Sequence, residues 1–369
     1  MKMLYASFVN VEAESMLGVK KKILGQIKGF RSNGNLVSYT WCEGKDFIAY
    51  EENDKKMHLC SFNNNLSKRI NMYHSSLLNY IKLKRIDAVY IRYALSDFFL
   101  IRFLKKLKKL GVRVYLEIPT YPYDKEVKGT KLSIDKLFRN KLKLYVDRVV
   151  ISSCEAKEVF GIPVIQMDNG VTVKDIKFVE RKYNPEKQNI NLIGVSFIRY
   201  TNGYDRLIKG LKSYYLQPDR EKEIYITFIG EGNELQSLME LTQELELEKY
   251  VNFTGQKTGK DLDLYYEEAD IAIGSLGDHR VGITKKSPLK SREYCARGIP
   301  FISSIIDNGF PGNPEFILKV NDTDEPINMN ELIDFYNKLG KTNNISKEMH
   351  DYSLQRFDWS VQCKKINML

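Results

Sequence analysis

The sequence predicts an α/β protein of two doubly wound, Rossmann-like domains, each built around a parallel β-sheet. Short apolar runs alternate with amphipathic stretches along the whole chain, which is the rhythm of strand–helix–strand units. A polar, charged segment at residues 174–189, which contains Pro185, interrupts this rhythm and is typical of an inter-domain linker. The length of 369 residues also favours two domains over one.

The first half is expected to form one such sheet. Its first strand covers residues 3–9, and a helix covers residues 18–33 because Gly34 is placed to end it. Further strands are expected at residues 36–41, 58–62, 88–93, 112–118, 148–152 and 164–170, and further helices at 68–83 and 97–110. Strands that are joined through helices run parallel, so helices should cover both faces of this sheet.

The second half repeats the pattern. Strands are expected at residues 191–197, 224–230, 251–255, 270–275 and 300–304, and helices at 203–216, 233–247, 260–268 and 288–297. We therefore divide the chain into residues 1–180 and 185–345, and expect an amphipathic helix over 350–369 to pack back on the first domain through Trp359. Open α/β sheets bind ligands at the carboxyl ends of their strands, so a cleft between the two domains is the expected site.

Positive charge is concentrated in the first half. The net charge is +10, but residues 1–180 carry 32 Lys and Arg against 19 Asp and Glu, while the remainder carries 25 against 28. The densest run, RFLKKLKKLGVR at 102–113, has leucines at helical spacing, so an ordinary solvated helix is one interpretation. Peripheral contact with an anionic membrane is the other. Nucleic acid is not an expected partner because no recognition motif or interleaved aromatic residues accompany the run.

The sequence also indicates a compartment. Five scattered cysteines without metal-ligand spacing are typical of reduced thiols: Cys42, Cys60, Cys154, Cys295 and Cys363. The start of the chain lacks the apolar core and cleavage site of a signal peptide, and no apolar run is long enough to span a bilayer. We expect a cytoplasmic protein, free or peripheral on the inner face of the membrane.

The segment SPLKSREYCARGIP at residues 287–300 predicts an anion-binding helix. Ser287 is a favoured N-cap residue, and Pro288 suits the first helical position. Gly298 is placed to end the helix, and Pro300 prevents its continuation. The helix follows a loop at the carboxyl end of an expected strand, so its free N–H groups and dipole suit a diphosphate.

Charged residues inside this helix support the same interpretation. Lys290 and Arg292 lie near its start, where cations are unfavourable unless an anion is bound. Glu293 lies about one turn further along, where its carboxylate can accept hydrogen bonds from both ribose hydroxyls. A capped surface helix with unrelated charges is the alternative.

The same segment resembles the nucleotide-binding helix of retaining glycosyltransferases of family four, which often reads S-P-x-K-x-x-E-Y-x-x-x-G-x-P. FIGEGNELQSL (228–238), VNFTGQKTGKDLDLYYEEADIAIGS (251–275) and IPVIQMDNGV (162–171) are similar to other parts of that family. SFIRYTNGYDRLIKGL (196–211) resembles most the subgroup of bacterial capsule and exopolysaccharide synthesis. The resemblance implies the GT-B fold and a nucleoside-diphosphate-sugar donor held by the second domain, with the acceptor on the first.

The chain departs from the family pattern in three places, one of which is residues 116–126, where a histidine is common in the family and none is present. Lys285 stands where many members have a second glutamate, and Phe197 and Asn202 stand where an arginine and a lysine are common. The diphosphate charge must then be met elsewhere, and the basic candidates are Arg199, Arg206, Arg280, Lys285, Lys286, Lys290 and Arg292. We expect the nucleotide sugar to contact Gly18, Asn202, Gly203, Arg206, Gly230, Arg280, Ser287, Lys290, Arg292 and Glu293.

Glu117 is the candidate for a catalytic contact with a sugar, although an ordinary glutamate at a strand end is the alternative. The Asp-x-Asp pattern at 261–263 lies at an expected helix start, and the four histidines lack ligand spacing, so we expect no metal and no cofactor. The expected activity is metal-independent transfer of a sugar to an oligosaccharide or lipid-linked acceptor, as in surface-polysaccharide synthesis. A GT-B-like sugar-nucleotide epimerase and an inert nucleotide-sugar or polyanion-binding protein are the alternatives.

Overall fold

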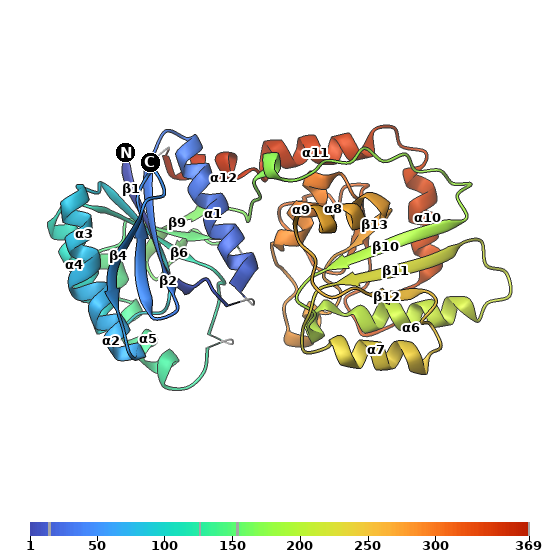
Figure 1. Cartoon of the computed structure of the whole chain (residues 1–369), viewed down its shortest axis with the longest axis horizontal. Helices are drawn as coiled ribbons and strands as arrows, with labels where there is room; N and C mark the ends of the chain where they lie inside the picture. The colour runs from blue at the N-terminus through green and yellow to red at the C-terminus, as the bar shows by residue number, and fades with distance from the viewer. Residues whose placement is uncertain (14–15, 125–126, 153–154, 368–369) are drawn as a thin grey trace. The chain divides into compact units, whose positions relative to one another are not determined.

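The computed structural model describes residues 1–13, 16–124, 127–152 and 155–367. The chain divides into two compact units (Figure 1), which are described separately below. Unit 1 comprises Met1–Thr172 and Trp359–Leu369, and unit 2 comprises Val173–Asp358. Each unit has its own hydrophobic core around one sheet.

Unit 1 contains a nine-stranded sheet in the order β4-β3-β2-β1-β5-β6-β7-β9-β8. β1 pairs in parallel with both β2 and β5, so the winding of the chain reverses between β1 and β5. The strands are β1 (Lys2–Asn10), β2 (Leu36–Glu43), β3 (Asp46–Tyr50), β4 (Lys56–Ser61), β5 (Ala88–Arg92), β6 (Arg113–Ile118), β7 (Arg148–Ile151), β8 (Glu158–Val159) and β9 (Ile162–Gln166).

The expectation that all of this sheet is parallel is wrong at both edges, since the two-residue strand β8 also pairs antiparallel with β9. β3, which the sequence reading missed, pairs antiparallel with both β2 and β4. Only Gly44 and Lys45 separate β2 from β3, and a link this short permits a hairpin but no helical crossover. The remaining long strands of the sheet follow the predicted parallel order.

The helices of unit 1 lie on both faces of its sheet (Figure 1). α1 and α12 pack side by side on one face, where Gly25 and Gly29 of α1 lie against Trp359 of α12. The helices are α1 (Leu17–Ser32), α2 (Asn65–Asn71), α3 (Leu77–Lys84), α4 (Phe98–Lys109), α5 (Thr130–Arg139) and α12 (Trp359–Asn367), with a π-helical turn at Met72–Ser76. α4 follows β5 and lies on the opposite face from α1 (Figure 1).

Unit 2 contains a six-stranded parallel sheet in the order β12-β11-β10-β13-β14-β15. The winding reverses between β10 and β13, so this unit is doubly wound as well. The strands are β10 (Asn189–Val195), β11 (Glu223–Ile229), β12 (Val251–Phe253), β13 (Ile271–Ile273), β14 (Phe301–Ser303) and β15 (Ile317–Lys319). The fold class predicted from the sequence, α/β with two Rossmann-like parallel-sheet domains, is confirmed.

In unit 2, α6 and α7 cover one face of the sheet, and α8, α9 and α11 the other (Figure 1). The helices are α6 (Tyr204–Tyr215), α7 (Leu235–Glu244), α8 (Gly259–Glu268), α9 (Leu289–Arg297), α10 (Met329–Leu339) and α11 (Ile345–Arg356). Where the sequence predicts one helix over 350–369, the structure has two, because α11 ends before Phe357 and α12 begins at Trp359. α11 packs on α9 in unit 2, and α12 belongs to unit 1.

Candidate functional site

The candidate site lies at the point where the winding of the unit 2 sheet reverses. β10 and β13 are neighbours there, and β10 ends at Val195 and β13 at Ile273. In open α/β sheets ligands bind outside the carboxyl ends of the two strands that flank such a reversal. Ser196 follows β10 directly and Gly274 follows β13, so these two residues mark the floor of the candidate site.

Lys290 brings a cation to this floor. Its Nζ donates a hydrogen bond of 2.7 Å to the carbonyl oxygen of Gly274 and lies 5.6 Å from the centre of the Tyr204 ring. The Tyr204 hydroxyl is in turn 2.9 Å from the Ser196 hydroxyl. Burial lowers the pKa of Lys290 to about 7; Asp278 opposes this shift, and the neighbouring Lys286 adds to it.

Asp278 and Lys286 complete the charged part of this site. Lys286 Nζ lies 3.0 Å from Oδ1 of the buried Asp278. Asp278 Oδ2 is also buried, yet it has no hydrogen-bond partner in the part of the chain that the structure describes. An unpartnered buried carboxylate oxygen costs free energy, so this atom has the capacity to accept one more hydrogen bond.

Helix α9 supplies the other expected contacts. Gly298 ends it with φ of 68°, as predicted, and its N–H bonds back to the carbonyl oxygens of Tyr294 and Cys295. Ser287 is buried but is not the N-cap, since that position falls on Pro288, and the helix begins at Leu289. The Pro288 ring has no hydroxyl and makes no capping hydrogen bond to the first turn.

Glu293 keeps part of its carboxylate accessible. Its side chain is 18% exposed, and Oε1 lies 3.5 Å from Nη2 of Arg297, one turn along the same helix. This ion pair is long, so it leaves the carboxylate able to accept further hydrogen bonds. Glu293 lies three residues after Lys290 on α9, so the two residues are neighbours on one helix face.

Two glycines allow the loops at this edge to pack closely. Gly203 has φ of 66°, and a Cβ at this position would lie 2.7 Å from the carbonyl carbon of Leu276. Gly230 has φ of 133°, and a Cβ there would lie 1.9 Å from the Ser196 carbonyl oxygen. Asn202 joins the same loops by accepting a hydrogen bond of 3.2 Å from the Leu276 N–H. These three residues shape the site through the backbone.

Arg206 and Arg280, both expected at the diphosphate, form hydrogen bonds with other groups of the protein. Arg206 is fully buried and donates to the carbonyl oxygens of Leu276, Asn321 and Glu325. The Arg280 guanidinium makes two hydrogen bonds of 2.9 Å to Asp205. Both guanidinium groups hold loops together, which a reading of the sequence could not show because their partners are distant along the chain.

Arg292 is occupied in the same way. It is fully buried, pairs with both carboxylate oxygens of Asp307, and lies over the rings of Phe310 and Phe357 at 5.2 and 4.5 Å. Of the seven basic candidates, Lys290 and Lys286 are the ones that the structure places around Gly274 and Asp278. Arg199 lies apart from them, with its guanidinium 5.0 Å from the Phe197 ring, and Lys285 is exposed.

Two predicted residues belong to unit 1. Gly18 is the second residue of α1, and a Cβ there would meet no atom within 4 Å. Glu117 is buried at the carboxyl end of β6, where it forms ion pairs with Lys22 at 2.9 Å and Arg92 at 3.3 Å. Tyr5 and Gln26 also donate hydrogen bonds to it. Glu117 is therefore the centre of a buried network of ion pairs and hydrogen bonds.

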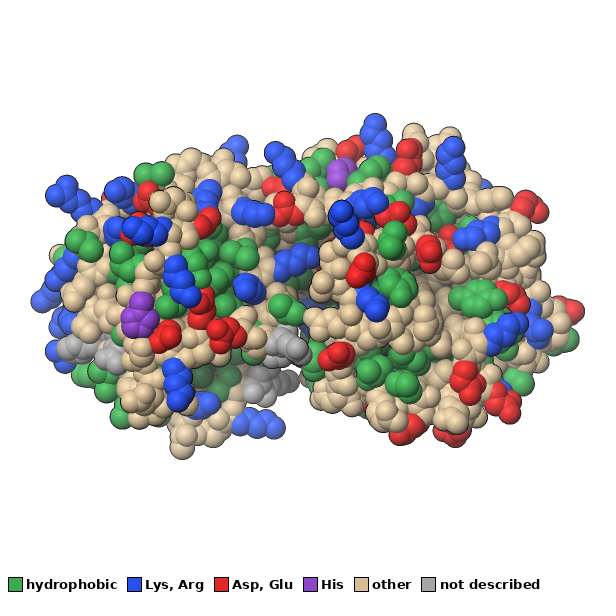
Figure 2. Space-filling view, in the orientation of Figure 1, with side chains coloured by type: hydrophobic (Ala, Val, Ile, Leu, Met, Phe, Trp, Pro, Cys, Tyr) green, Lys and Arg blue, Asp and Glu red, His purple; other side chains and the backbone are tan. Residues whose placement is uncertain are grey.

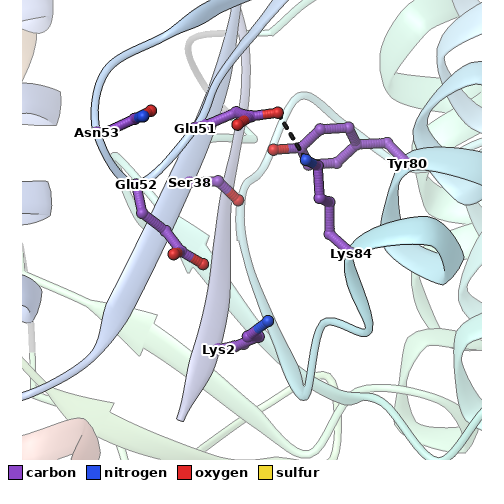
Figure 3. A pocket seen from close by; sticks show the side chains of 7 residues that line it. All are labelled: Lys2, Ser38, Glu51, Glu52, Asn53, Tyr80 and Lys84. Carbon is purple, nitrogen blue, oxygen red and sulfur yellow. Dashed lines mark hydrogen bonds and ion pairs between the residues drawn. The ribbon is translucent and has the colours of Figure 1, made fainter.

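A polar pocket of about 250 Å³ lies at the opposite, amino-terminal edge of the unit 1 sheet (Figure 3). Glu51, in the turn after β3, forms an ion pair of 2.6 Å with Lys84 of α3, and both line this pocket together with Ser38 and Tyr80. Lys84 and Glu51 neutralise each other there, and the edge is not the one at which α/β sheets bind their substrates. We therefore do not assign the activity to it.

Across the described residues, no group of three or more His, Cys, Asp or Glu side chains is placed to hold a metal ion. Sequence reasoning missed Ser196, Tyr204 and Asp278. The first two carry a recognisable signal, because Ser196 directly follows an apolar strand and Tyr204 directly follows the loop glycine Gly203. Asp278 carries none, since its burial depends on how the loop after β13 folds.

Comparison with known proteins shows what the part of the chain around this site is similar to. Residues 175–344 match the family described as "Glycosyl transferases group 1". They contain the whole of the candidate site, including Lys290 and Glu293.

One curated protein that the chain resembles is an alpha-monoglucosyldiacylglycerol synthase of Streptococcus pneumoniae. The two sequences are 25% identical over 167 residues, which cover 45% of this chain and 36% of that enzyme. The matched part of the chain thus spans only about a third of the length of its curated relative.

Solved structures resemble the chain over its whole length. A glycosyltransferase from Rickettsia africae has a TM-score of 0.68 at 14% identity, with 100% of this chain and 97% of that chain covered. The sucrose-phosphate synthase of Thermosynechococcus elongatus has a TM-score of 0.64 at 13% identity, with 100% and 98% covered. A pneumococcal O-GlcNAc transferase, solved with UDP and GlcNAc, has a TM-score of 0.60 at 11% identity, with 100% and 98% covered. At these identities the likeness concerns the fold, which is that of GT-B glycosyltransferases.

Proposed function

We propose that this protein transfers a sugar from a nucleoside diphosphate sugar to a hydroxyl group of a glycan, and that unit 2 holds the donor. The observation that carries this proposal is Lys290, an ammonium with a pKa lowered to about 7 by burial at the carboxyl edge of the sheet. Keeping a cation in this position costs free energy unless an anion accompanies it. A diphosphate is the anion that a glycosyltransferase group 1 domain would bring there.

Each end of the donor has a matching group. The ammonium groups of Lys290 and Lys286 and the first N–H groups of α9 would face the diphosphate. Glu293, one turn further along the helix, would accept hydrogen bonds from the ribose hydroxyls. The unpartnered Oδ2 of Asp278 would accept a hydrogen bond from a hydroxyl of the transferred sugar.

The chemistry follows from where charge develops. The acceptor oxygen bonds to the anomeric carbon, the bond from that carbon to the diphosphate oxygen breaks, and the hydroxyl proton passes to the released diphosphate. Negative charge therefore grows on the diphosphate, next to Lys290 and the start of α9, where fixed cations and N–H groups stabilise it. The proposed reaction needs no metal or cofactor and, by resemblance to family four, retains the anomeric configuration.

The acceptor that we propose is a lipid-linked or free oligosaccharide of bacterial capsule or exopolysaccharide synthesis, bound by unit 1. The excess of basic residues in the first half of the chain suits a lipid pyrophosphate. The name of the pneumococcal relative, a glucosyldiacylglycerol synthase, also supports an acceptor with a lipid part. Such an enzyme would work in the cytoplasm, on the inner face of the membrane.

Thermal unfolding with UDP, GDP and ADP tests donor binding. We expect at least one diphosphate to raise the melting temperature of the wild-type protein, and Lys290→Met to abolish that increase. Lys260→Met, an exposed lysine at the start of α8, is the matched control and should respond as the wild type does. If none of the three diphosphates stabilises the protein, the proposed donor site is wrong.

Turnover of the matching nucleotide sugars distinguishes the proposal from its alternatives. A transferase releases the nucleoside diphosphate, faster with an acceptor, and Glu293→Gln should slow this release while the exposed control Glu348→Gln does not. Conversion of one nucleotide sugar into its epimer without an acceptor would identify an epimerase. Binding without either reaction would identify an inert nucleotide-sugar-binding protein.

A further inference from the structure

Helix α5 of unit 1 attaches to its domain through a carboxylate. Asp135 is its one fully buried side chain. The hydroxyl of Tyr123 and the N–H of Ser96 each donate a 2.7 Å hydrogen bond to Asp135, and the hydroxyl of Tyr93 donates to it as well. A surface helix normally packs its apolar stripe on the core, and α5 packs a polar residue there instead.

The apolar side of α5 consequently points to solvent. Ile134 is 46% exposed and Leu137 is 67% exposed. Phe138 lies one turn after Ile134, so Ile134, Leu137 and Phe138 follow the i, i+3, i+4 spacing of a single helix face. Lys141 lies just past the end of α5, with its Nζ 5.0 Å from the centre of the Phe138 ring. Three large apolar side chains thus form one stripe, with a lysine at its end.

Helix α4 lies next to this stripe and contributes most of the cations. A groove of about 490 Å³ runs between the two, lined from α4 by Phe98 and by Arg102, Lys105, Lys106 and Lys109, and from the other side by Phe138, Lys141 and Tyr145. Phe98 is 53% exposed, so an apolar ring marks the start of α4 as well. The amino group of Lys108 donates to the carbonyl oxygen of Leu144 and holds the two sides together.

We propose that this α4–α5 surface, defined by Phe98, Lys105 and Lys109 of α4 and by Ile134, Leu137 and Phe138 of α5, docks on the surface of an anionic lipid bilayer. Its apolar side chains enter the boundary between head groups and acyl chains, and its lysines pair with lipid phosphates. Neither helix is long or apolar enough to cross a membrane, which is also true of every other described helix. The protein would therefore lie on the membrane surface.

The positive charge of the α4–α5 surface favours an anionic bilayer over other binding partners. Lysine and arginine side chains line the edge of unit 1 over α3 and α4 in Figure 2. A second copy of this chain would bring the same cations to the interface and would be repelled. A neutral apolar partner would leave them without counter-ions. An anionic bilayer supplies many phosphates in one plane and an apolar layer directly beneath them.

Sedimentation with vesicles tests this docking surface in the full-length protein without nucleotide. We expect wild-type protein to bind vesicles of phosphatidylcholine with about 30% phosphatidylglycerol at least tenfold more tightly than vesicles of phosphatidylcholine alone. Raising the salt from about 0.1 M to about 0.5 M should weaken that binding because it screens the lysines.

Two double substitutions separate the contribution of the lysines from that of the apolar side chains. Lys105→Glu/Lys109→Glu and Ile134→Ser/Leu137→Ser should each weaken binding to anionic vesicles by about tenfold or more. Lys260→Glu/Lys341→Glu and Leu216→Ser/Leu264→Ser carry the same changes at exposed positions of unit 2 and should bind as the wild type does. Circular dichroism confirms that every variant is folded.

Three results would overturn the proposal. They are equal binding to both kinds of vesicle, no binding to either kind, and unchanged binding by both α4–α5 variants. A dimer in solution that Ile134→Ser/Leu137→Ser abolishes would assign the surface to self-association instead. The melting temperature with nucleoside diphosphate is measured on the same samples. This measurement shows whether a protein that does not bind vesicles still binds the donor nucleotide.

Discussion

The ammonium of Lys22 on α1 lies 2.9 Å from a carboxylate oxygen of Glu117 on β6, and both side chains are buried. Arg92 at the end of β5 approaches the other carboxylate oxygen to 3.3 Å. Burial opposes ionisation of Glu117, but Lys22 and Arg92 outweigh it and hold its pKa at about 2. One carboxylate thus compensates two buried cations and connects a helix to two strands.

We expect Glu117→Gln to lower the free energy of unfolding by roughly 3–5 kcal/mol, because it leaves two buried cations without a counter-ion. Urea unfolding at neutral pH measures this. Adding Lys22→Met should restore part of the loss, since it removes one of those cations.

The pH dependence gives an independent check. The native pKa of Glu117 lies below the unfolded value of about 4.3, so its contribution is complete above that pH and is lost as the pH falls toward about 2. Stability between about pH 5 and about pH 3 should therefore fall more steeply in wild type than in Glu117→Gln. Equal slopes would mean that Glu117 is not held ionised by this network.

A second prediction concerns Arg292, whose guanidinium pairs with Asp307 below the rings of Phe310 and Phe357. Arg292→Lys keeps the charge but loses the paired hydrogen bonds and the planar stack. We expect a loss of roughly 2–4 kcal/mol of stability, with an affinity for the nucleoside diphosphate within about twofold of wild type. Calorimetric titration measures the affinity. A large loss of affinity with intact stability would instead indicate that Arg292 contacts the diphosphate.

The sequence was sufficient for the repeated elements of the fold and for the helix at the candidate site. The period of the apolar residues predicts most strands. Gly298 ends α9 as predicted, because glycine adopts the positive φ that this position requires. Helix α5 and strand β3 were missed for physical reasons. α5 does not turn its apolar stripe to the core, and β3 belongs to a hairpin within an otherwise helix-linked order.

The sequence could not predict which of the charged candidates are paired within the protein, because ion pairing depends on the tertiary structure. Arg280, Arg292 and Glu117 carry the residue types that a diphosphate or sugar site needs. Arg280 pairs with Asp205, 75 positions away along the chain, and Arg292 with Asp307 across a loop. Lys290 differs because its hydrogen-bond acceptor is the Gly274 carbonyl group, which cancels no charge.

The third prediction follows from the low pKa of Lys290. Bound diphosphate favours the charged ammonium, so binding raises the pKa of Lys290 above its value of about 7 in the free protein. The Kd for a nucleotide sugar, whose pyrophosphate does not titrate in this range, should be constant below about pH 7 and rise by up to about tenfold per pH unit above it. Isothermal titration between about pH 6 and about pH 9 measures the profile.

Two variants distinguish the contributions of Lys290 and Lys286 to the pH dependence of the Kd. Lys290→Met should weaken binding and remove its pH dependence. Lys286→Met should move the onset to higher pH, because Lys286 contributes to lowering the pKa of Lys290. A Kd that does not change with pH in the wild-type protein would show that Lys290 does not meet the diphosphate.

The last prediction compares two glycines of the same helix, α1. A Cβ at Gly29 would lie 2.5 Å from the Trp359 carbonyl oxygen, so Gly29→Ala must push α12 away and should cost roughly 2 kcal/mol or more. A Cβ at Gly18 would meet nothing within 4 Å, so Gly18→Ala should raise stability by up to about 1 kcal/mol through helix propensity alone. Urea unfolding measures both variants. If the backbone at Gly18 approaches the diphosphate of the donor, Gly18→Ala will also weaken nucleotide binding while it stabilises the fold. Unchanged stability in Gly29→Ala would contradict the packing of α12 on α1.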